Sequence, residues 1–274
     1  MPCYDLHSHT YYSDGEMSPL ELVTTAVQAG TTHLAITDHD NFDAYLSLQN
    51  EDLPEGFTLI PGAEFSTHWF GYEIHVLGLW LDPENDTLKQ GVAAQKERRQ
   101  IRAENIDIKL SELGIIGALA DLKIQYPYSL LTRAHFAKWL LDKNYCTHFQ
   151  QAFDKYLGQD KPAYTGITWP EIEEVINWIH AAGGKAVLAH PLRYPLKTKR
   201  IRELIKYFKK VGGDGIEVVT ASINLQQMQM LATICDTLDL KASCGADFHG
   251  KHMPWIKMGN LLELPKKCKP IWEE

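Results

Sequence analysis

Two histidines near the amino terminus, His7 and His9, are separated by one residue, and Asp14 follows five residues after His9. Side chains alternate between the two faces of an extended strand, so both imidazoles would point the same way. Two imidazoles at this spacing can bind one metal ion, and a nearby carboxylate can bind a second. Alone, such a pair is more often a half-buried polar pair, so its meaning depends on the rest of the chain.

Further histidines and carboxylates occur where short apolar segments end: His39 after 34–38, Glu64 after 59–63, His75 within 74–81, His190 after 186–189, and Asp247 and His249 after 243–246. Active sites of α/β barrels collect at the carboxyl ends of the strands, so six histidines and three carboxylates would converge on one mouth. Any one of them alone would be explained as a polar strand-end residue. Nine together indicate a metal centre, and imidazole and carboxylate without thiolate suit manganese, zinc or ferrous iron.

The elements that would position these residues are short apolar segments separated by helical stretches. The expected strands cover residues 3–7, 33–37, 57–60, 74–81, 185–189, 215–219 and 241–244. This alternation predicts an α/β fold with a parallel sheet, and about seven such units favour a barrel-like arrangement over an open sheet. Capping boxes that begin at Ser18 and at Thr168 predict the starts of two helices.

The segment from about residue 102 to residue 166 interrupts this alternation. It has a mostly helical pattern without a convincing strand, and it carries nine aromatic residues between Tyr126 and Tyr164. We therefore expect a barrel domain of residues 1–101 and 167–274, with a small helical insertion of residues 102–166 beside the mouth. Most of these aromatics would form the insertion's own core, and one or two could stack on a base or ribose.

The composition is that of a folded soluble protein, with 45% hydrophobic and 23% charged residues in a chain of 274. We expect neither a membrane span nor a signal peptide. The five cysteines are scattered and form no C-x-x-C pair, which is typical of reduced thiols in a cytoplasmic protein. The net charge of −8 argues against a protein that coats nucleic acid, although bound metals would still allow an anionic substrate.

Six segments together resemble the PHP (polymerase and histidinol phosphatase) family of metal-dependent phosphoesterases: DLHSHTYYSDG, TDHD, GAEFS, IHVLG, AHP and GADFHG. The segment TRAHFA, residues 132–137, resembles the branch that acts on nucleoside 3′,5′-bisphosphates and trims RNA from its 5′ end. The resemblance implies a distorted (β/α)7 barrel with a trinuclear metal centre. It implies one ion on His7, His9, Glu64 and Asp247, a second on Asp14, His39 and His249 with Glu64 bridging, and a third on Glu64, His75 and His190.

The resemblance also implies a hydrolase. A metal-activated hydroxide would attack the 3′-phosphate of a bisphosphate or a 5′-terminal phosphodiester of short RNA, and phosphate would be one product. The residues predicted to be catalytic are Asp14, His39, Glu64 and His249. Three divalent ions are expected, with Mn²⁺ as the family-based choice and Zn²⁺, Fe²⁺ or Mg²⁺ as alternatives. We expect no membrane and no obligate protein partner.

Three further residues are predicted to contact substrate phosphate: Arg133 and His135 of the TRAHFA segment, and Arg193. A guanidinium binds phosphate through two parallel hydrogen bonds. The structural alternative for the first two is a helix-surface arginine with a histidine packed beneath it. Residues 193–210 hold eight of the 27 lysines and arginines, opposed only by Glu203, and could contact an RNA tail or could simply be a solvated face.

Two other readings stay open. The protein could be a phosphatase for another small phosphomonoester, such as histidinol phosphate, or a non-catalytic metal-binding PHP module. All nine ligand positions are filled here, which argues against the module. Asp5 and Asp38 are candidates for groups that orient the ligand histidines.

Overall fold

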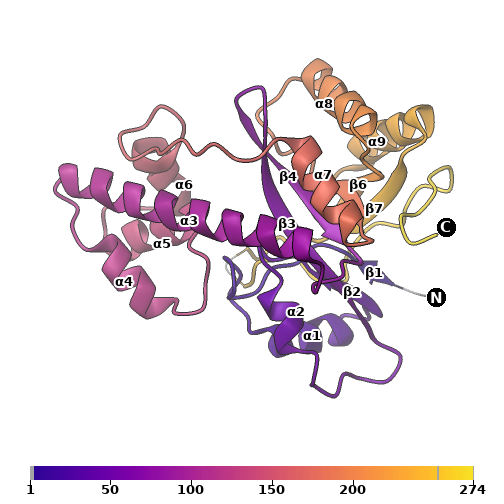
Figure 1. Cartoon of the computed structure of the whole chain (residues 1–274), viewed down its shortest axis with the longest axis horizontal. Helices are drawn as coiled ribbons and strands as arrows, with labels where there is room; N and C mark the ends of the chain where they lie inside the picture. The colour runs from indigo at the N-terminus through magenta and orange to yellow at the C-terminus, as the bar shows by residue number, and fades with distance from the viewer. Residues whose placement is uncertain (1–2, 252, 274) are drawn as a thin grey trace.

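A seven-stranded sheet, in which the strands follow their order along the chain, forms the centre of the molecule (Figure 1). The computed structural model describes residues 3–251 and 253–273. The strands are β1 (Tyr4–Asp5), β2 (His33–Ile36), β3 (Thr58–Trp69), β4 (Tyr72–Leu79), β5 (Lys185–Leu188), β6 (Gly215–Thr220) and β7 (Lys241–Gly245). The Leu6 amide donates to the Cys244 carbonyl at 3.0 Å, so the first and last strands meet and the sheet is nearly closed. The predicted barrel-like α/β fold is confirmed.

The sheet is not parallel throughout, and in this respect the sequence-based expectation is wrong. Strand β4 is antiparallel to both β3 and β5, whereas the other neighbouring pairs are parallel. Phe70 and Gly71 join β3 to β4 with φ values of 46° and 85°. Two consecutive positive φ values make a two-residue hairpin turn, which leaves no crossover helix between these strands. Strand β3 therefore runs on past its predicted end, and Glu64 lies inside it.

Five helices lie around the sheet: α1 (Pro19–Gln28), α2 (Asp43–Ser47), α7 (Ile172–Ala181), α8 (Thr198–Lys210) and α9 (Leu225–Leu238). Ser18 and Glu21 form the predicted capping box of α1. The predicted capping box at Thr168 is wrong, because α7 begins after Glu171 without a side-chain cap. The chain before α7 instead pairs with β3, where the His68 amide donates to the Pro170 carbonyl at 2.9 Å.

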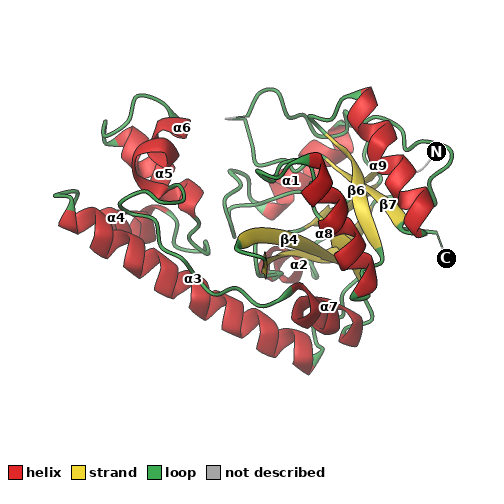
Figure 2. Ribbon diagram, turned by 90° about the horizontal axis from the view of Figure 1, so that it is seen from above, coloured by secondary structure: helices red, strands yellow, loops and turns green. Residues whose placement is uncertain are grey.

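The helical insertion extends to one side of the barrel (Figure 2). It comprises the second half of α3 (Asp86–Glu112), then α4 (Ala118–Gln125), α5 (Arg133–Asp142), α6 (Phe149–Ala152) and a π-helix (Phe153–Leu157). The expected boundary at residue 102 falls within α3, which is one continuous helix. Phe136 and Trp139 are buried in a core separate from that of the barrel, whereas Tyr128 is 69% exposed.

Apolar cores on both sides of the sheet position the mouth, by which we mean the carboxyl ends of the barrel strands. Leu6, Leu77 and Val187 fill the barrel interior, and two further cores pack the helices against the outside of the sheet. Each fully buried aliphatic side chain stabilises the fold by about 1.5–3 kcal/mol. Within the described residues, no helix combines the length and apolarity of a membrane span. The five cysteines form no disulfide.

Candidate metal centre

All nine predicted metal ligands come together at the mouth of the barrel. Their potential ligand atoms form four overlapping groups within which the atoms lie no more than 4.8 Å apart. The groups are His9, Asp14, His39 and His249; His7, Glu64 and His190; His7, His9 and Asp247; and His39, Glu64 and His75. We call these nine residues the mouth cluster.

The Glu64 carboxylate lies at the centre of the mouth cluster. Its Oε1 is 2.9 Å from His75 Nδ1 and 2.9 Å from His190 Nε2. Its Oε2 lies close to three further imidazoles: 3.1 Å from His39 Nδ1, 3.3 Å from His9 Nε2 and 3.4 Å from His7 Nε2. His9 belongs to two of the four groups, so the assignment of each residue to a particular ion stays a prediction.

The backbone holds two residues of the mouth cluster in unusual conformations. His190 and Asp247 have φ values of 27° and 53°, in a region that non-glycine residues rarely adopt. The Asp247 amide donates to the His7 carbonyl at 2.9 Å, so pairing with the chain after β1 holds this turn in place. Strain of this kind persists where the surrounding structure imposes it, and it concentrates at functional sites.

The electrostatics of the mouth cluster are those of buried, mutually compensating charges. Burial alone would lower the pKa of His75, but Glu64 and Glu73 outweigh it and raise the pKa to about 10. Burial would also lower the pKa of His249, but the charges of Asp247 and Asp14 outweigh it and raise that pKa to about 9. Because metal ligation needs neutral imidazoles, cations that bind here would displace these protons.

Two buried atoms support the fit of a metal ion. His39 Nδ1 lies 3.1 Å from Glu64 Oε2 and Asp14 Oδ1 lies 3.3 Å from His249 Nε2, but neither atom makes a hydrogen bond of suitable geometry within the described part of the chain. A buried polar atom without a partner is costly and calls for an explanation, which an ion supplies. Asp14 Oδ2 is held separately by the Thr132 hydroxyl at 3.0 Å, so Asp14 presents Oδ1 to the cluster. Imidazoles and carboxylates in this number fit divalent transition metals.

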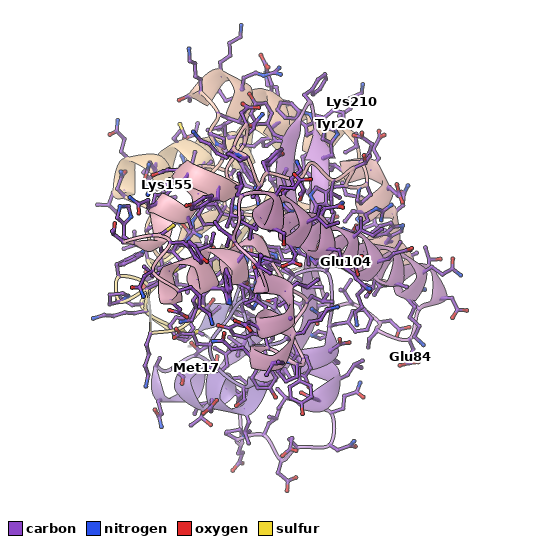
Figure 3. All side chains as sticks on the ribbon, turned by 90° about the vertical axis from the view of Figure 1, so that its left-hand side faces the viewer. Met17, Glu84, Glu104, Lys155, Tyr207 and Lys210 are labelled. Atoms are coloured by element: carbon purple, nitrogen blue, oxygen red, sulfur yellow. The ribbon has the colours of Figure 1, made fainter. Side chains whose placement is uncertain are left out.

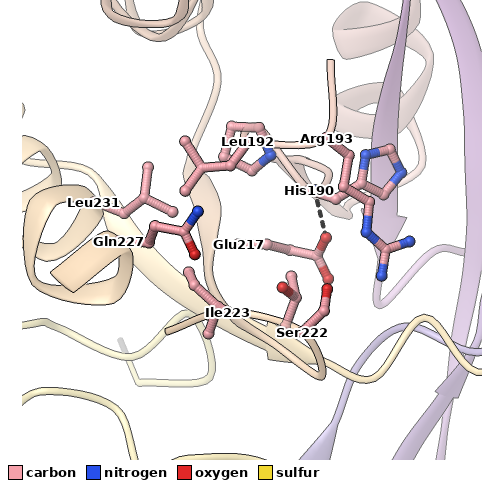
Figure 4. Close-up of a pocket in the computed structure, with 10 residues that line it drawn as sticks. His190, Leu192, Arg193, Glu217, Ser222, Ile223, Gln227 and Leu231 are labelled. Carbon is pink, nitrogen blue, oxygen red and sulfur yellow. Dashed lines mark hydrogen bonds between the residues drawn. The ribbon is translucent and has the colours of Figure 1, made fainter. Parts of the chain in front are cut away.

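A tenth residue, Glu217 of β6, supports the mouth cluster and was missed by the sequence analysis. Its carboxylate is fully buried, with Oε1 3.0 Å from His7 Nδ1 and Oε2 accepting the His190 amide at 2.6 Å (Figure 4). A carboxylate on Nδ1 fixes the imidazole so that Nε2 faces the ions. The register of β6 against β7 shifts between Glu217 and Val219, and such bulges re-aim side chains. A glutamate within the apolar segment 215–219 was the available signal.

The two predicted orienting groups behave differently. Asp38 accepts hydrogen bonds from the Thr10 amide at 2.8 Å and the Ser13 hydroxyl at 2.5 Å, and Ser13 Oγ lies 3.3 Å from His9 Nδ1. Asp38 therefore acts on His9 through Ser13. Asp5 accepts the Ala246 amide at 2.8 Å, which supports the turn before Asp247.

Comparison with known proteins gives a consistent answer. The profile of the PHP domain matches residues 5–221. The chain belongs to the PHP domain family. It is 40% identical to a 5′-3′ exoribonuclease of Haemophilus influenzae, over 99% of this chain and 98% of that protein. It is 34% identical to a 3′,5′-nucleoside bisphosphate phosphatase of Chromobacterium violaceum, over 98% of this chain and 95% of that protein.

The structure of an amidohydrolase from Chromobacterium violaceum superposes with a TM-score of 0.87 at 34% identity, covering 98% of this chain and 94% of that one.

Within this PHP chain, the two predicted phosphate-binding arginines flank the mouth cluster. Arg133 Nη2 donates to Glu73 Oε2 at 3.2 Å, and Glu73 Oε1 lies 3.7 Å from the cluster residue His75. Arg193, which lies between β5 and α8, pairs with the carboxylate of Asp247, which follows β7. Both guanidiniums are partly exposed, so a bound phosphate could reach them.

His135 is placed differently from the two arginines. It is 4% exposed, and its Nδ1 accepts the Thr132 amide at 3.0 Å, which completes a capping box at the start of α5. Burial lowers its pKa to about 4, so the imidazole is neutral near pH 7. His135 is therefore packed in the way that the structural alternative describes. A contact between His135 and phosphate stays a prediction.

A large cavity separates the insertion from the barrel. Its volume is about 890 Å³, and its walls include Tyr11, Tyr128, Phe149, Phe153 and Trp255. Asp14 and His249 of the mouth cluster lie on its border. The PHP site therefore opens directly into an aromatic-lined space.

Proposed function

We propose that this chain is a metal-dependent hydrolase that removes the 3′-phosphate of nucleoside 3′,5′-bisphosphates and releases nucleotides from the 5′ end of short RNA. The observation that carries the proposal is the convergence of nine imidazoles and carboxylates, six of them buried and three half-buried, with Glu64 at their centre. The names of the related exoribonuclease and bisphosphate phosphatase support this choice of substrates. Three divalent ions would occupy the cluster, with Mn²⁺ as the first candidate.

The residues of the mouth cluster have distinct tasks in this proposal. Bound divalent ions would activate a water molecule and neutralise charge on the reacting phosphoryl group. Glu64 would join the ion sites, because its two oxygens face imidazoles from all sides. Asp14, His39 and His249 would hold the edge that borders the cavity. Glu217 would keep His7 and His190 in position through two hydrogen bonds.

Substrate binding would use the groups around the cluster. Arg133 and Arg193 lie on different elements and can each donate to phosphate oxygens. The cavity of about 890 Å³ is large enough for a nucleoside, and its aromatic walls offer faces on which a base can stack. His135 borders the same cavity and would line the substrate path.

A substrate panel tests the proposal. Metal-free protein is reloaded with Mn²⁺, and kcat/KM is measured for 3′,5′-bisphosphonucleosides, their 2′,5′ isomers, 5′-phosphorylated short RNAs and histidinol phosphate. We expect the highest values for the 3′,5′-bisphosphates or the RNAs. Turnover of histidinol phosphate alone would favour the small-phosphomonoester alternative. No turnover of any compound, with Zn²⁺ and Fe²⁺ also tried, would indicate a non-catalytic module.

A further inference from the structure

The turn between β3 and β4 carries a residue that its conformation does not favour. Phe70 occupies the first position of the two-residue turn with φ 46°, where asparagine, aspartate or glycine is usual. Its ring is 68% exposed. A bulky aromatic residue is disfavoured here both by its backbone and by its contact with water. The Phe70 ring packs edge-on against Trp69, with ring centres 5.1 Å apart, but this contact leaves most of Phe70 exposed, which points to a role in binding.

The hairpin extends beyond the mouth cluster and carries this ring at its tip. His75 of the mouth cluster is opposite Ser66 in the β3–β4 register, and Trp69 is opposite Tyr72 next to the turn. At 3.4 Å per residue, Phe70 lies roughly 14 Å along the hairpin from the Ser66–His75 pair. The Arg200 guanidinium of α8 lies 5.5 Å from the centre of the Phe70 ring and 5.0 Å from that of Trp69.

Helix α8 carries a row of exposed cations beside this hairpin. Lys199, Arg202, Lys206 and Lys210 follow at intervals of three and four residues, so they share the outer face of the helix. None of the four makes an ion pair within the described residues, whereas Arg200 pairs with Glu203 at 2.8 Å. Tyr207 and Lys210 lie at one edge of the molecule, away from Met17 (Figure 3).

The row of cations begins shortly after the cluster residue His190 along the chain. Helix α8 follows strand β5 and the cluster residue His190, so it starts near the carboxyl end of the strands and runs back along the outside of the barrel. Residues 193–210 carry a charge of +7 in a chain whose net charge is −8. Such a local excess on an acidic protein attracts a polyanion to one place.

We propose that Phe70 and the outer face of α8 bind single-stranded RNA on the 3′ side of the nucleotide that occupies the mouth cluster. An exposed aromatic ring beside a row of cations is the arrangement that single strands use, with bases stacked on the ring and phosphates along the cations. This surface, which we call the α8 tract, rests on the proposed function. It adds to that function a binding surface that RNA substrates would contact and mononucleotide substrates would not.

The proposal is tested with Phe70→Asn and with the double variant Arg202→Gln/Lys206→Gln. Asparagine suits the positive φ and should preserve the fold. The matched control is Lys266→Gln/Lys267→Gln, which removes the same charge from the carboxyl-terminal segment. That segment is bound to the opening residues of β5 and β7, through Lys185 and Ala242, at the end of the barrel away from the mouth.

Binding of a 3′-labelled, 5′-phosphorylated RNA is followed by fluorescence anisotropy in the presence of a chelator, which prevents cleavage. Phe70→Asn should weaken binding about 5- to 100-fold, which is the worth of one stacked base. The Arg202→Gln/Lys206→Gln variant should lower the slope of log K against log salt by about 1.4, since each contact to a single strand contributes about 0.7. The control should keep the wild-type affinity and slope.

Hydrolysis separates this proposal from the proposed function. With Mn²⁺, both α8-tract variants should lose kcat/KM on RNA and keep it on a 3′,5′-bisphosphonucleoside. Equal RNA affinity for the wild type, the variants and the control would overturn the α8 tract, even if the enzyme is active. Equal affinity for a blunt RNA duplex would overturn it too, because paired bases cannot stack on Phe70. Loss of all hydrolysis by the wild type, with RNA binding still sensitive to Phe70, would instead reject the proposed function.

Discussion

The mouth cluster and the insertion border the same cavity, but they contribute to the site differently. Every residue of the mouth cluster belongs to the barrel, is buried or half-buried, and contacts other members of the cluster. The insertion reaches the cluster from outside, with Thr132 bound to Asp14 and Arg133 bound to Glu73. The difference indicates that the barrel holds the chemistry and the insertion adjusts it. Substitutions in the two regions should therefore have effects of different kinds.

The sharpest test of this division is Glu64→Gln in the mouth cluster. The change keeps the shape but removes the charge that faces five imidazoles, so metal content should fall. We expect kcat to fall by on the order of 10²–10³ or more, as when a key electrostatic group is removed from other active sites. Metal analysis and steady-state kinetics measure both quantities.

His180→Gln is a suitable control for Glu64→Gln, because this histidine lies on α7, is 40% exposed and pairs with Asp214. It should retain its metal content and rate. Near-normal activity of Glu64→Gln would reject the idea that one carboxylate joins all the ion sites.

The convergence of the nine residues could be predicted from the sequence because most of them lie on or close after a strand. His39 and His190 directly follow apolar segments, and the barrel brings strand ends together whatever their separation in the chain. Glu64 was found in the same way, although β3 continues past it. Glu217 was missed because one glutamate in an apolar segment does not show by itself that its carboxylate bonds His7 and the His190 amide, which come from distant parts of the chain.

Glu217→Gln tests whether the mouth cluster depends on a residue outside its ligand set. The amide can accept from His7 or from the His190 amide, but its NH₂ group then faces the other donor. Loss of such a supporting carboxylate usually lowers metal affinity about 10- to 100-fold. Competition with a chromogenic chelator measures that affinity. Unchanged affinity would confine Glu217 to a packing role.

The insertion was harder to predict because its contacts form only when it packs against the barrel. Its helices and its aromatic core follow from local pattern. The partner of Arg133, however, is Glu73 on a hairpin some 60 residues earlier in the chain. No local pattern shows that His135 completes the cap of α5 rather than projecting into solvent.

Arg133→Ala should affect the substrate more than the metal. Removing a charge-assisted contact to phosphate costs about 1.5–3 kcal/mol, so kcat/KM should fall about 10- to 100-fold with metal content unchanged. Arg98→Ala on α3, where Arg98 contacts Gln95, is the control and should behave as wild type. If Arg133→Ala loses metal instead, the arginine acts through Glu73 and His75, and the insertion shares in holding the ions.

The smallest expected effect is that of Thr132→Val, which tests the contact between the two regions directly. Thr132 caps α5 and donates its hydroxyl to Asp14 Oδ2. Loss of the cap should lower the free energy of unfolding by about 0.5–2 kcal/mol, measured by urea denaturation. Metal affinity should fall less than in Glu217→Gln, because Asp14 keeps Oδ1 directed at the cluster.

Thr132→Ser separates the hydroxyl from the rest of the side chain. Serine caps a helix as well as threonine and can donate to Asp14, so both stability and metal affinity should return toward wild-type values. If Thr132→Val lowers stability without changing metal affinity, the insertion is anchored at Asp14 but does not adjust the ions. If both quantities fall with valine and recover with serine, the insertion acts on the mouth cluster through this one hydrogen bond.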